Sequence, residues 1–316
     1  MTIGILAYGP RAGLAVFRAL QAVERVSTGA IGGYAAFAAF DRNGRLHRAG
    51  TQRGGTRTLF VDGETTGVMP RDEISNAMLA GVMSSGPDRP EPLSQFVPAV
   101  EGVGLVTGHR LPNAAARSGI PLNIEVMQGL RSGLTPMEAV DRALDCNAQA
   151  DAGVIAANLL GEVYARNTLR VSRRPDLGHA RRQDDASGAI VEVLHNAIFP
   201  VESLSALAAE IAMDVMVPRH QRAGVIIVEA GMPLHPGRSN RVFVDPEGRA
   251  LRVETTDGSI LAGTHNCAAV YLESEVLRDG DILGYTLVEP NVVVEGGRIV
   301  SLSGQRTCRL PYRSPI

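Results

Sequence analysis

Two threonines stand where catalysis by a chain-terminal nucleophile would need them. Thr2 becomes terminal when Met1 is removed, which is usual before a small residue, and it opens a strand-like run, Ile3–Ala7. Thr28 follows a helical segment and precedes a glycine-rich strand entry. A terminal hydroxyl residue can use its own α-amine as general base, because a free α-amine has a pKa of about 7.7 to 8.0. We take Thr2 and Thr28 as candidate catalytic residues, against the alternatives of an ordinary strand residue and an ordinary turn residue.

The glycine-rich segment 51–57 has the composition of a substrate-binding loop. Backbone N–H groups around Gly54, Gly55 and Thr56 can stabilise an amide carbonyl as it becomes an oxyanion, because fixed donors need no reorganisation. The guanidinium of Arg53, or that of Arg57, can hold a substrate carboxylate through two parallel hydrogen bonds. The competing interpretation is a hairpin exit with solvated arginines. We expect Arg53, Gly54, Gly55 and Thr56 to bind substrate.

A second nucleophile candidate lies in the C-terminal part, where His265 and Cys267 occur two residues apart. Residues at i and i+2 of a strand point to the same face, and a nearby imidazole can help a thiol to ionise. The apolar residues that follow, 268–272, favour the alternative that Cys267 is a small buried hydrophobic residue.

The composition argues against several cofactor chemistries. All 31 cationic residues are arginines, so a lysine Schiff base, pyridoxal chemistry and a P-loop lysine are excluded. The seven histidines show neither H-x-H nor H-x-x-x-H spacing, and no strand-linked G-x-G-x-x-G is present. We expect neither a metal nor a cofactor.

Charge and cysteine usage indicate the environment and the partners. The 31 arginines nearly balance 33 acidic residues, which does not favour nucleic acid, and tryptophan is absent, which does not favour a stacking platform. Three widely spaced cysteines fit a reducing compartment, and no apolar run is long enough for a membrane span or a signal peptide. We expect a cytoplasmic protein that acts on a small-molecule substrate, without nucleic acid or membrane partners, and we include homo-oligomers among its states.

Hydrophobic spacing and turn residues predict the elements that position these side chains. The helical period of Ala12–Val26 and Val201–Met216 predicts two core-facing helices. Thr135-Pro136 followed by Glu138 predicts a capped helix start, and Asn43-Gly44 between alternating runs predicts a hairpin. Further expectations are strands at 34–40, 102–107, 153–157 and 189–195, a short helix at 113–117, an exposed connection at 84–98, and a charged surface loop at 170–185 that acts as an active-site lid.

From residue 224 onward the pattern changes to short strands separated by turn residues, as in Asp257-Gly258 and Asp279-Gly280. This pattern is typical of an all-β unit, a small sandwich or barrel. We therefore expect two domains, an α/β domain over residues 1–220 and a β-rich C-terminal domain over residues 221–316.

The first half of the chain resembles the catalytic core of the N-terminal nucleophile (Ntn) hydrolases, nearest the glycosylasparaginase and isoaspartyl-peptidase branch. Asp41 and Gly44 match the D-x-x-G turn of that branch, and Gly54-Gly55 matches its later glycine pair. The strand 153–156 reads G-x-I-A, and Asn167-Thr168 matches a further N-T dipeptide.

The resemblance leaves the nucleophile open. Tyr34 follows Gly33 at the place of the nucleophilic threonine, whereas the region of Ser27 and Thr28 is where self-cleavage occurs in that branch. The start Met1-Thr2 is similar to a group of uncharacterised bacterial Ntn-hydrolase-like proteins.

The resemblance implies an Ntn-type αββα sandwich and an amidohydrolase that cleaves a small amide or an acylated amino-acid derivative. Two alternatives remain: a non-catalytic scaffold that keeps the sandwich for small-molecule binding or assembly, which a tyrosine at position 34 favours, and a cysteine amidase that uses Cys267.

Overall fold

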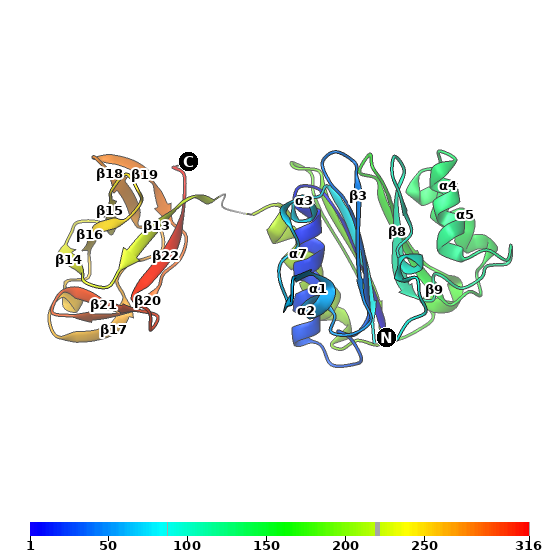
Figure 1. Ribbon diagram of the computed structural model, residues 1–316, viewed down its shortest axis with the longest axis horizontal. Helices are drawn as coiled ribbons and strands as arrows, with labels where there is room; N and C mark the ends of the chain where they lie inside the picture. The colour runs from blue at the N-terminus through cyan, green and yellow to red at the C-terminus, as the bar shows by residue number, and fades with distance from the viewer. Residues whose placement is uncertain (87, 219–221, 316) are drawn as a thin grey trace. The chain divides into compact units, whose positions relative to one another are not determined.

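The structure is a computed structural model that describes residues 1–86, 88–218 and 222–315 (Figure 1). The chain divides into two compact units, Met1–Pro218 and Arg219–Ile316. The boundary expected between residues 220 and 221 lies outside the described residues. Unit 1 combines helices and strands, unit 2 is rich in strands, and the protein as a whole is of the mixed α+β class with a β-rich C-terminal part.

A six-stranded sheet forms the centre of unit 1, with the strand order β11-β12-β1-β6-β2-β3. Its strands are β1 (Thr2–Tyr8), β2 (Ala35–Phe40), β3 (Leu46–Thr51), β6 (Leu79–Ser85), β11 (Leu177–Asp184) and β12 (Ala189–Asn196). Every neighbouring pair is antiparallel. Strand β1 lies in the interior of this sheet, and its first six residues are buried, as an apolar run covered on both faces requires.

A second sheet of four strands, in the order β10-β9-β8-β7, packs against the first (Figure 1). Its strands are β7 (Ala99–Val100), β8 (Gly104–Arg110), β9 (Ala152–Asn158) and β10 (Val163–Asn167). Leu6 and Leu194 from the first sheet, with Tyr34 just before β2, meet Leu105 and Ile155 from the second sheet in one buried cluster. Alternate residues of β1 therefore face the space between the two sheets, whereas Ile3 and Ile5 face the other way.

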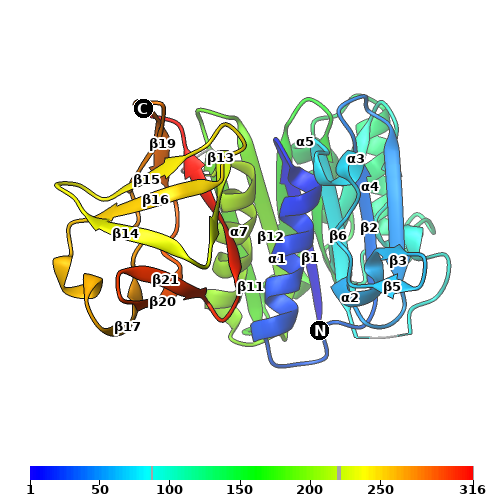
Figure 2. The ribbon, with the colours of Figure 1, turned by 60° about the vertical axis from the view of Figure 1, so that its left-hand side comes forward.

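Helices cover the outer face of each sheet. Helices α1 (Ala12–Val26) and α7 (Val201–Met216) pack side by side on the six-stranded sheet, and Figure 2 shows α1 running across it. Helices α4 (Leu122–Arg131) and α5 (Pro136–Cys146) cover the four-stranded sheet. The predicted capping box of α5 is confirmed, because Thr135 and Glu138 bond reciprocally to each other's backbone N–H groups. Unit 1 thus has four layers: helices, sheet, sheet, helices.

Short elements complete unit 1. They are α2 (Thr56–Leu59), β4 (Val61–Asp62), β5 (Thr65–Thr66), α3 (Asp72–Ser75), the 3₁₀ helix η1 (Leu93–Phe96) and α6 (Leu169–Ser172). The helix predicted at 113–117 is wrong, and the sequence interpretation missed α4 a few residues later. The surface loop predicted at 170–185 is wrong as well, because α6 and β11 occupy most of that segment, whereas its role as an active-site lid stays a prediction. Gly178 and Ala180 are buried in β11 and alternate with exposed polar residues, which is the pattern of a half-buried edge strand.

Two glycines allow the sheets of unit 1 to approach each other closely. A Cβ atom on Gly4 of β1 would lie 2.5 Å from the backbone oxygen of Gly108 in β8. The backbone cannot yield as a flexible side chain can, so a methyl group at this position would force the two sheets apart. The contact lies two residues from Thr2, and it holds β8 against the start of β1.

We expect Gly4→Ala to lower the free energy of unfolding by about 1–3 kcal/mol, because overpacking against backbone displaces whole strands. Gly81→Ala is the matched control on neighbouring β6, since its Cβ would meet the end of the Leu105 side chain, which can rotate away. Thermal or urea unfolding of the two variants measures the difference. Equal losses of stability in both would refute backbone contact as the reason for glycine at position 4.

Unit 2 is a single ten-stranded sheet with one apolar core. Its strand order is β13-β22-β19-β18-β15-β16-β14-β21-β20-β17, and β14 and β16, like β15 and β18, pair in parallel. The strands are β13 (Arg222–Glu229), β14 (Met232–Pro236), β15 (Arg241–Val244), β16 (Ala250–Thr255), β17 (Thr264–Ala268), β18 (Glu275–Arg278), β19 (Asp281–Thr286), β20 (Asn291–Glu295), β21 (Arg298–Leu302) and β22 (Thr307–Arg313), with the 3₁₀ helix η2 at Gly258–Leu261. Among the described residues, no helix of either unit has the length and apolarity to cross a membrane.

Candidate active site

One end of the six-stranded sheet gathers polar residues around Thr2. In the strand register Thr2 lies opposite Asn196 of β12 and opposite Ser85 of β6. Strand β2 begins and strand β3 ends at the same end of the sheet, where Ala35 pairs with Ser84 of β6 on one side and with Thr51 of β3 on the other. The antiparallel order therefore brings residues from the two halves of unit 1 to one end of the sheet.

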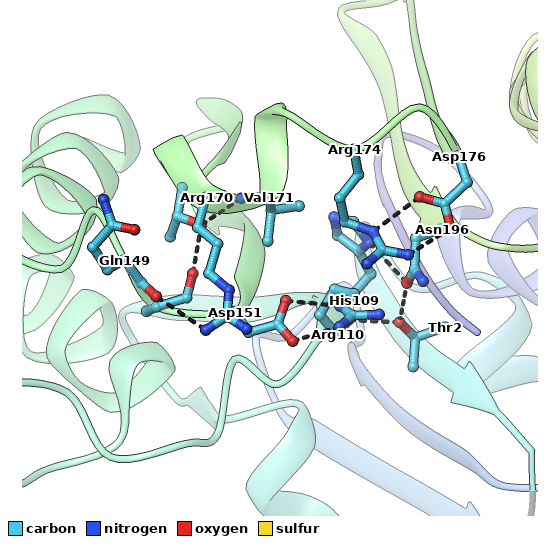
Figure 3. Close-up of polar contacts among 12 residues, drawn as sticks. Thr2, His109, Arg110, Gln149, Asp151, Arg170, Val171, Arg174, Asp176 and Asn196 are labelled. Atoms are coloured by element: carbon cyan, nitrogen blue, oxygen red, sulfur yellow. Dashed lines mark hydrogen bonds and ion pairs between the residues drawn. The ribbon is translucent and has the colours of Figure 1, made fainter.

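The Thr2 side chain faces the second sheet and is almost fully buried, with 2% of the residue exposed. Its Oγ1 accepts a hydrogen bond from the backbone N–H of Arg110 at 2.5 Å, and it lies 2.8 Å from Asn196 Oδ1 (Figure 3). Arg110 ends β8 with φ = 67°, a left-handed conformation that costs a non-glycine residue about 1–2 kcal/mol. Strain of this kind at the contact with Thr2 is typical of a functional site.

The buried imidazole of His109 contacts the side chain of Asn196. His109 Nδ1 lies 3.3 Å from Asn196 Oδ1, and His109 Nε2 lies 2.7 Å from Asn167 Oδ1. Complete burial lowers the pKa of His109 to about 4, so the ring is neutral at pH 7, with one donor and one acceptor nitrogen. One of the two amides must therefore turn its NH₂ group toward the ring.

Rotation of the Asn167 amide satisfies the ring and keeps the bond from Thr2. Asn167 Nδ2 then donates to His109 Nε2, and His109 Nδ1–H donates to Asn196 Oδ1, which also accepts the Thr2 hydroxyl proton at 2.8 Å. Asn196 Nδ2 is buried without a hydrogen-bond partner among the described residues. The Thr2 hydroxyl therefore accepts from Arg110 and donates to Asn196.

Positive charge surrounds the start of β1. Burial and the guanidinium groups of Arg110, Arg89 and Arg174 lower the pKa of the Met1 α-amine, which favours its neutral, basic form. Two of these arginines have acidic partners: Arg110 pairs with Asp151 at 2.5 Å, and Arg174 pairs with Asp176 at 2.6 Å (Figure 3). The amine that an N-terminal nucleophile uses is its own, which for Thr2 is free only after removal of Met1.

The second catalytic candidate, Thr28, lies near this end but is exposed. Its backbone exchanges two hydrogen bonds with Phe199, and the next turn holds the Met1 side chain, since the N–H of Ala30 lies 3.0 Å from Met1 Sδ. Thr28 is an internal residue without a buried partner network like that of Thr2. The structure therefore brings Thr28 to the neighbourhood of Thr2 without giving it the same chemistry.

The predicted substrate-binding loop lies over α1, on the outer face of the sheet. Glu24 of α1 accepts hydrogen bonds from the Thr56 N–H at 3.0 and 3.1 Å and from Thr56 Oγ1 at 2.5 Å, and burial raises the pKa of Glu24. Gly54 and Gly55 have positive φ angles of 96° and 53°, which explains both glycines by backbone geometry. The Thr56 donor that we expected to hold an oxyanion is thus already used by the chain itself.

Arg53 is largely exposed and pairs with Asp88, with Nη2 and Oδ2 2.8 Å apart. A cavity of about 340 Å³ adjoins Glu24, Gly54 and Thr56, but Thr2 faces the opposite side of the sheet. The role of Arg53, Gly54, Gly55 and Thr56 in substrate binding stays a prediction, and the structure does not bring them into contact with the polar cluster around Thr2.

Tyr34 is a core residue. Its ring packs edge-on against Phe96 with centroids 5.0 Å apart, and burial raises the pKa of its hydroxyl. The hydroxyl is buried without a hydrogen-bond partner among the described residues. The position that corresponds to the threonine of the asparaginase branch is therefore filled by a packing side chain.

In unit 2, Cys267 and His265 lie on β17, but the imidazole contacts the Ala262 carbonyl, with His265 Nε2 2.5 Å from the oxygen. Burial raises the pKa of the Cys267 thiol, which disfavours the nucleophilic thiolate. No group of three or more His, Cys, Asp or Glu side chains arranged to hold a metal occurs within residues 1–86, 88–218 and 222–315.

Unit 1 is thus a four-layered α+β domain with a buried threonine, an amide-imidazole network and an arginine cluster at one end of its central sheet. The chain belongs to the family described as Domain of unknown function (DUF6963), which matches residues 2–225. Residues 231–307 match a second family, described as Domain of unknown function (DUF7259). A search of the curated proteins finds no match to the chain.

Proposed function

We propose that the protein is an Ntn-type amidohydrolase that cleaves a small amide or an acylated amino-acid derivative, with Thr2 as nucleophile after the Met1–Thr2 bond is cut. The observation that carries the proposal is the position of Thr2 Oγ1. It lies at the first residue of an interior strand, faces the space between the two sheets, and contacts the Arg110 N–H and Asn196.

The layer order supports the same proposal. Two antiparallel sheets packed face to face between helices are what the Ntn resemblance implies, and a nucleophile at the start of a strand between those sheets fits that arrangement. Three free cysteines, none in a disulfide, agree with a cytoplasmic setting for this chemistry.

The proposed reaction uses groups within this network. The Thr2 α-amine takes the hydroxyl proton while Oγ1 attacks the carbonyl carbon of the amide, and the carbonyl electron pair moves onto its oxygen. The intermediate collapses, the C–N bond breaks, and the leaving amine takes the proton from the Thr2 ammonium. Water then attacks the acyl ester with the amine again as base, releasing the acid and restoring Thr2. The guanidinium groups that lower the pKa of the Met1 α-amine lie at the start of β1, and we expect them to act in the same direction on the Thr2 amine that this cycle requires.

The first test identifies the terminal residue and its reactivity. We expect N-terminal sequencing of the purified protein to begin at Thr2, and we expect p-nitrophenyl acetate, an activated ester, to acetylate that residue in a rapid burst. Intact mass followed by peptide mapping locates the acetyl group. A chain that keeps Met1 and gains no acetyl group at Thr2 would overturn the proposal.

One observation favours a second candidate, a non-catalytic binding or assembly scaffold. Thr2 is 2% exposed, and the threonine position of the asparaginase branch carries the buried Tyr34. A scaffold has no need of a free Thr2 amine, so retention of Met1 together with unchanged small-molecule binding in a Thr2 variant would support it.

A further inference from the structure

A serine hydroxyl contacts the carbonyl group that precedes Thr2. Ser85 Oγ donates a hydrogen bond to the Met1 carbonyl oxygen at 2.7 Å. Ser85 is the last residue of β6 and the cross-strand partner of Thr2, so its position relative to Thr2 is set by the sheet register. The residue is 2% exposed, and this contact is therefore made away from bulk water, where a hydrogen bond is electrostatically stronger.

Arg89 in turn contacts Ser85. Arg89 Nη2 donates a hydrogen bond to Ser85 Oγ at 2.6 Å, and Gln52 Oε1 accepts a hydrogen bond from the backbone N–H of Arg89 at 2.8 Å. This donation occupies a lone pair of the hydroxyl oxygen and leaves its proton directed at the carbonyl.

The charge of Arg89 has no acidic partner in the ion pairs of the described residues. Its sequence neighbour Asp88 pairs with Arg53, and Glu91 accepts a hydrogen bond from Gln52. The Arg89 Nε atom is buried and has no hydrogen-bond partner among the described residues. In contrast, Arg110 and Arg174 are neutralised by Asp151 and Asp176. Arg89 is therefore the positive charge in the cluster that is available to a developing negative charge.

We propose that Ser85 stabilises the oxyanion of the proposed Thr2 reaction, by donating its Oγ proton to the oxygen of the attacked carbonyl, and that Arg89 positions and polarises Ser85. The inference rests on the proposed function. The Met1 carbonyl carbon is bonded to the Thr2 nitrogen, and Ser85 donates a hydrogen bond to its oxygen. The acyl group in the proposed reaction is bonded to Oγ1 of the same residue, Thr2, so its carbonyl oxygen takes the place of the Met1 oxygen as acceptor. When the electron pair moves onto oxygen, the hydrogen bond from Ser85 becomes charge-assisted and strengthens, as transition-state stabilisation requires.

The test measures the rate of Thr2 acetylation by p-nitrophenyl acetate in the full-length protein. We expect Ser85→Ala to slow it by about 10²–10³-fold, the usual effect of removing one oxyanion donor, and Ser85→Thr, which keeps the hydroxyl, to restore most of the rate. Ser84→Ala is the matched control, because Ser84 is the adjacent buried serine and its Oγ donates instead to the Tyr34 backbone oxygen. It should acetylate at the wild-type rate.

Arg89→Gln gives a second readout that does not depend on Ser85 variants folding. The guanidinium lowers the pKa of the Met1 α-amine, and we expect it to act likewise on the Thr2 amine that replaces it, so its removal should slow acetylation and move the rising limb of the pH–rate profile to higher pH. Equal acetylation rates in wild type, Ser85→Ala and Ser84→Ala, or an unmoved pH limb in Arg89→Gln, would overturn the assignment while leaving the Thr2 nucleophile in place. A wild-type protein without acetyl at Thr2 would overturn both.

Discussion

Thr2→Ala is expected to abolish amide hydrolysis and to leave the fold intact. Alanine removes the attacking oxygen but is tolerated in a buried strand, where the loss is one hydroxyl group and its contacts with Asn196 and Arg110. Removal of the nucleophile in a comparable covalent mechanism lowers kcat by about 10⁴-fold or more, because only binding and oxyanion stabilisation remain. The measurement is turnover of a library of small N-acyl amino acids and amides by wild type and variant at equal concentration.

Two further variants separate the hydroxyl from the terminal amine. Thr2→Ser keeps both groups, so we expect activity within about tenfold of the wild type. An alanine inserted between Met1 and Thr2 keeps the hydroxyl but moves the free amine away from it, and we expect this variant to be as inactive as Thr2→Ala. Hydrolysis that survives either Thr2→Ala or the alanine insertion would assign the nucleophile to another residue.

The helices that pack on the outside of the six-stranded sheet were predictable from the sequence. Ala12–Val26 and Val201–Met216 form helices with the predicted bounds, because an apolar stripe at helical period leaves little choice of structure. The capping box at Thr135 was equally readable, since it depends on local hydrogen bonds alone.

The errors occur where local composition and tertiary packing disagree. The charges of segment 170–185 predict a loop, yet its small residues Gly178 and Ala180 pack inward in edge strand β11. Small residues carry a weak hydrophobic signal, so their period of two was hidden by the arginines between them. The small residues of 113–117 predict a helix, but the helical period begins only after Pro121, at α4.

The candidate site was predictable at Thr2 and not at its partners. A small hydroxyl residue at the start of an apolar strand is visible in the sequence, whereas the partners Ser85, Arg110 and Asn196 are joined to it by strand register across large sequence separations. The glycine pair before Thr56 was visible too, but the group that accepts the Thr56 hydrogen bonds is the chain's own Glu24, 32 positions away. Sequence patterns therefore predict where helices and strands lie, whereas the pairing register between strands far apart in the sequence decides which side chains meet in one site.

The imidazole of His109, which contacts Asn196, is expected to make the stability of unit 1 fall at acid pH. The native pKa of His109 is about 4 because of its burial, whereas an unfolded chain has a histidine pKa of about 6.5. Below pH 6.5 the unfolded state therefore binds a proton that the native state does not bind. The free energy of unfolding falls as the pH falls from about 6.5 to about 4. A difference of this size corresponds to about 3 kcal/mol from one residue.

We expect His109→Gln to be less stable than the wild type at pH 7, where it loses well-placed hydrogen bonds, but to lose much less stability between pH 7 and pH 4. Because the chain has two compact units, hydrogen exchange of the β1 and β8 peptides is the suitable measurement, with each pH compared between wild type and variant. Groups that do not interact with His109, such as Glu24, titrate alike in both proteins and cancel in the difference, whereas His195, whose charge acts on His109, is part of the same response. Parallel loss of protection in the two proteins would show that His109 is not the residue that couples acid to the Thr2 site.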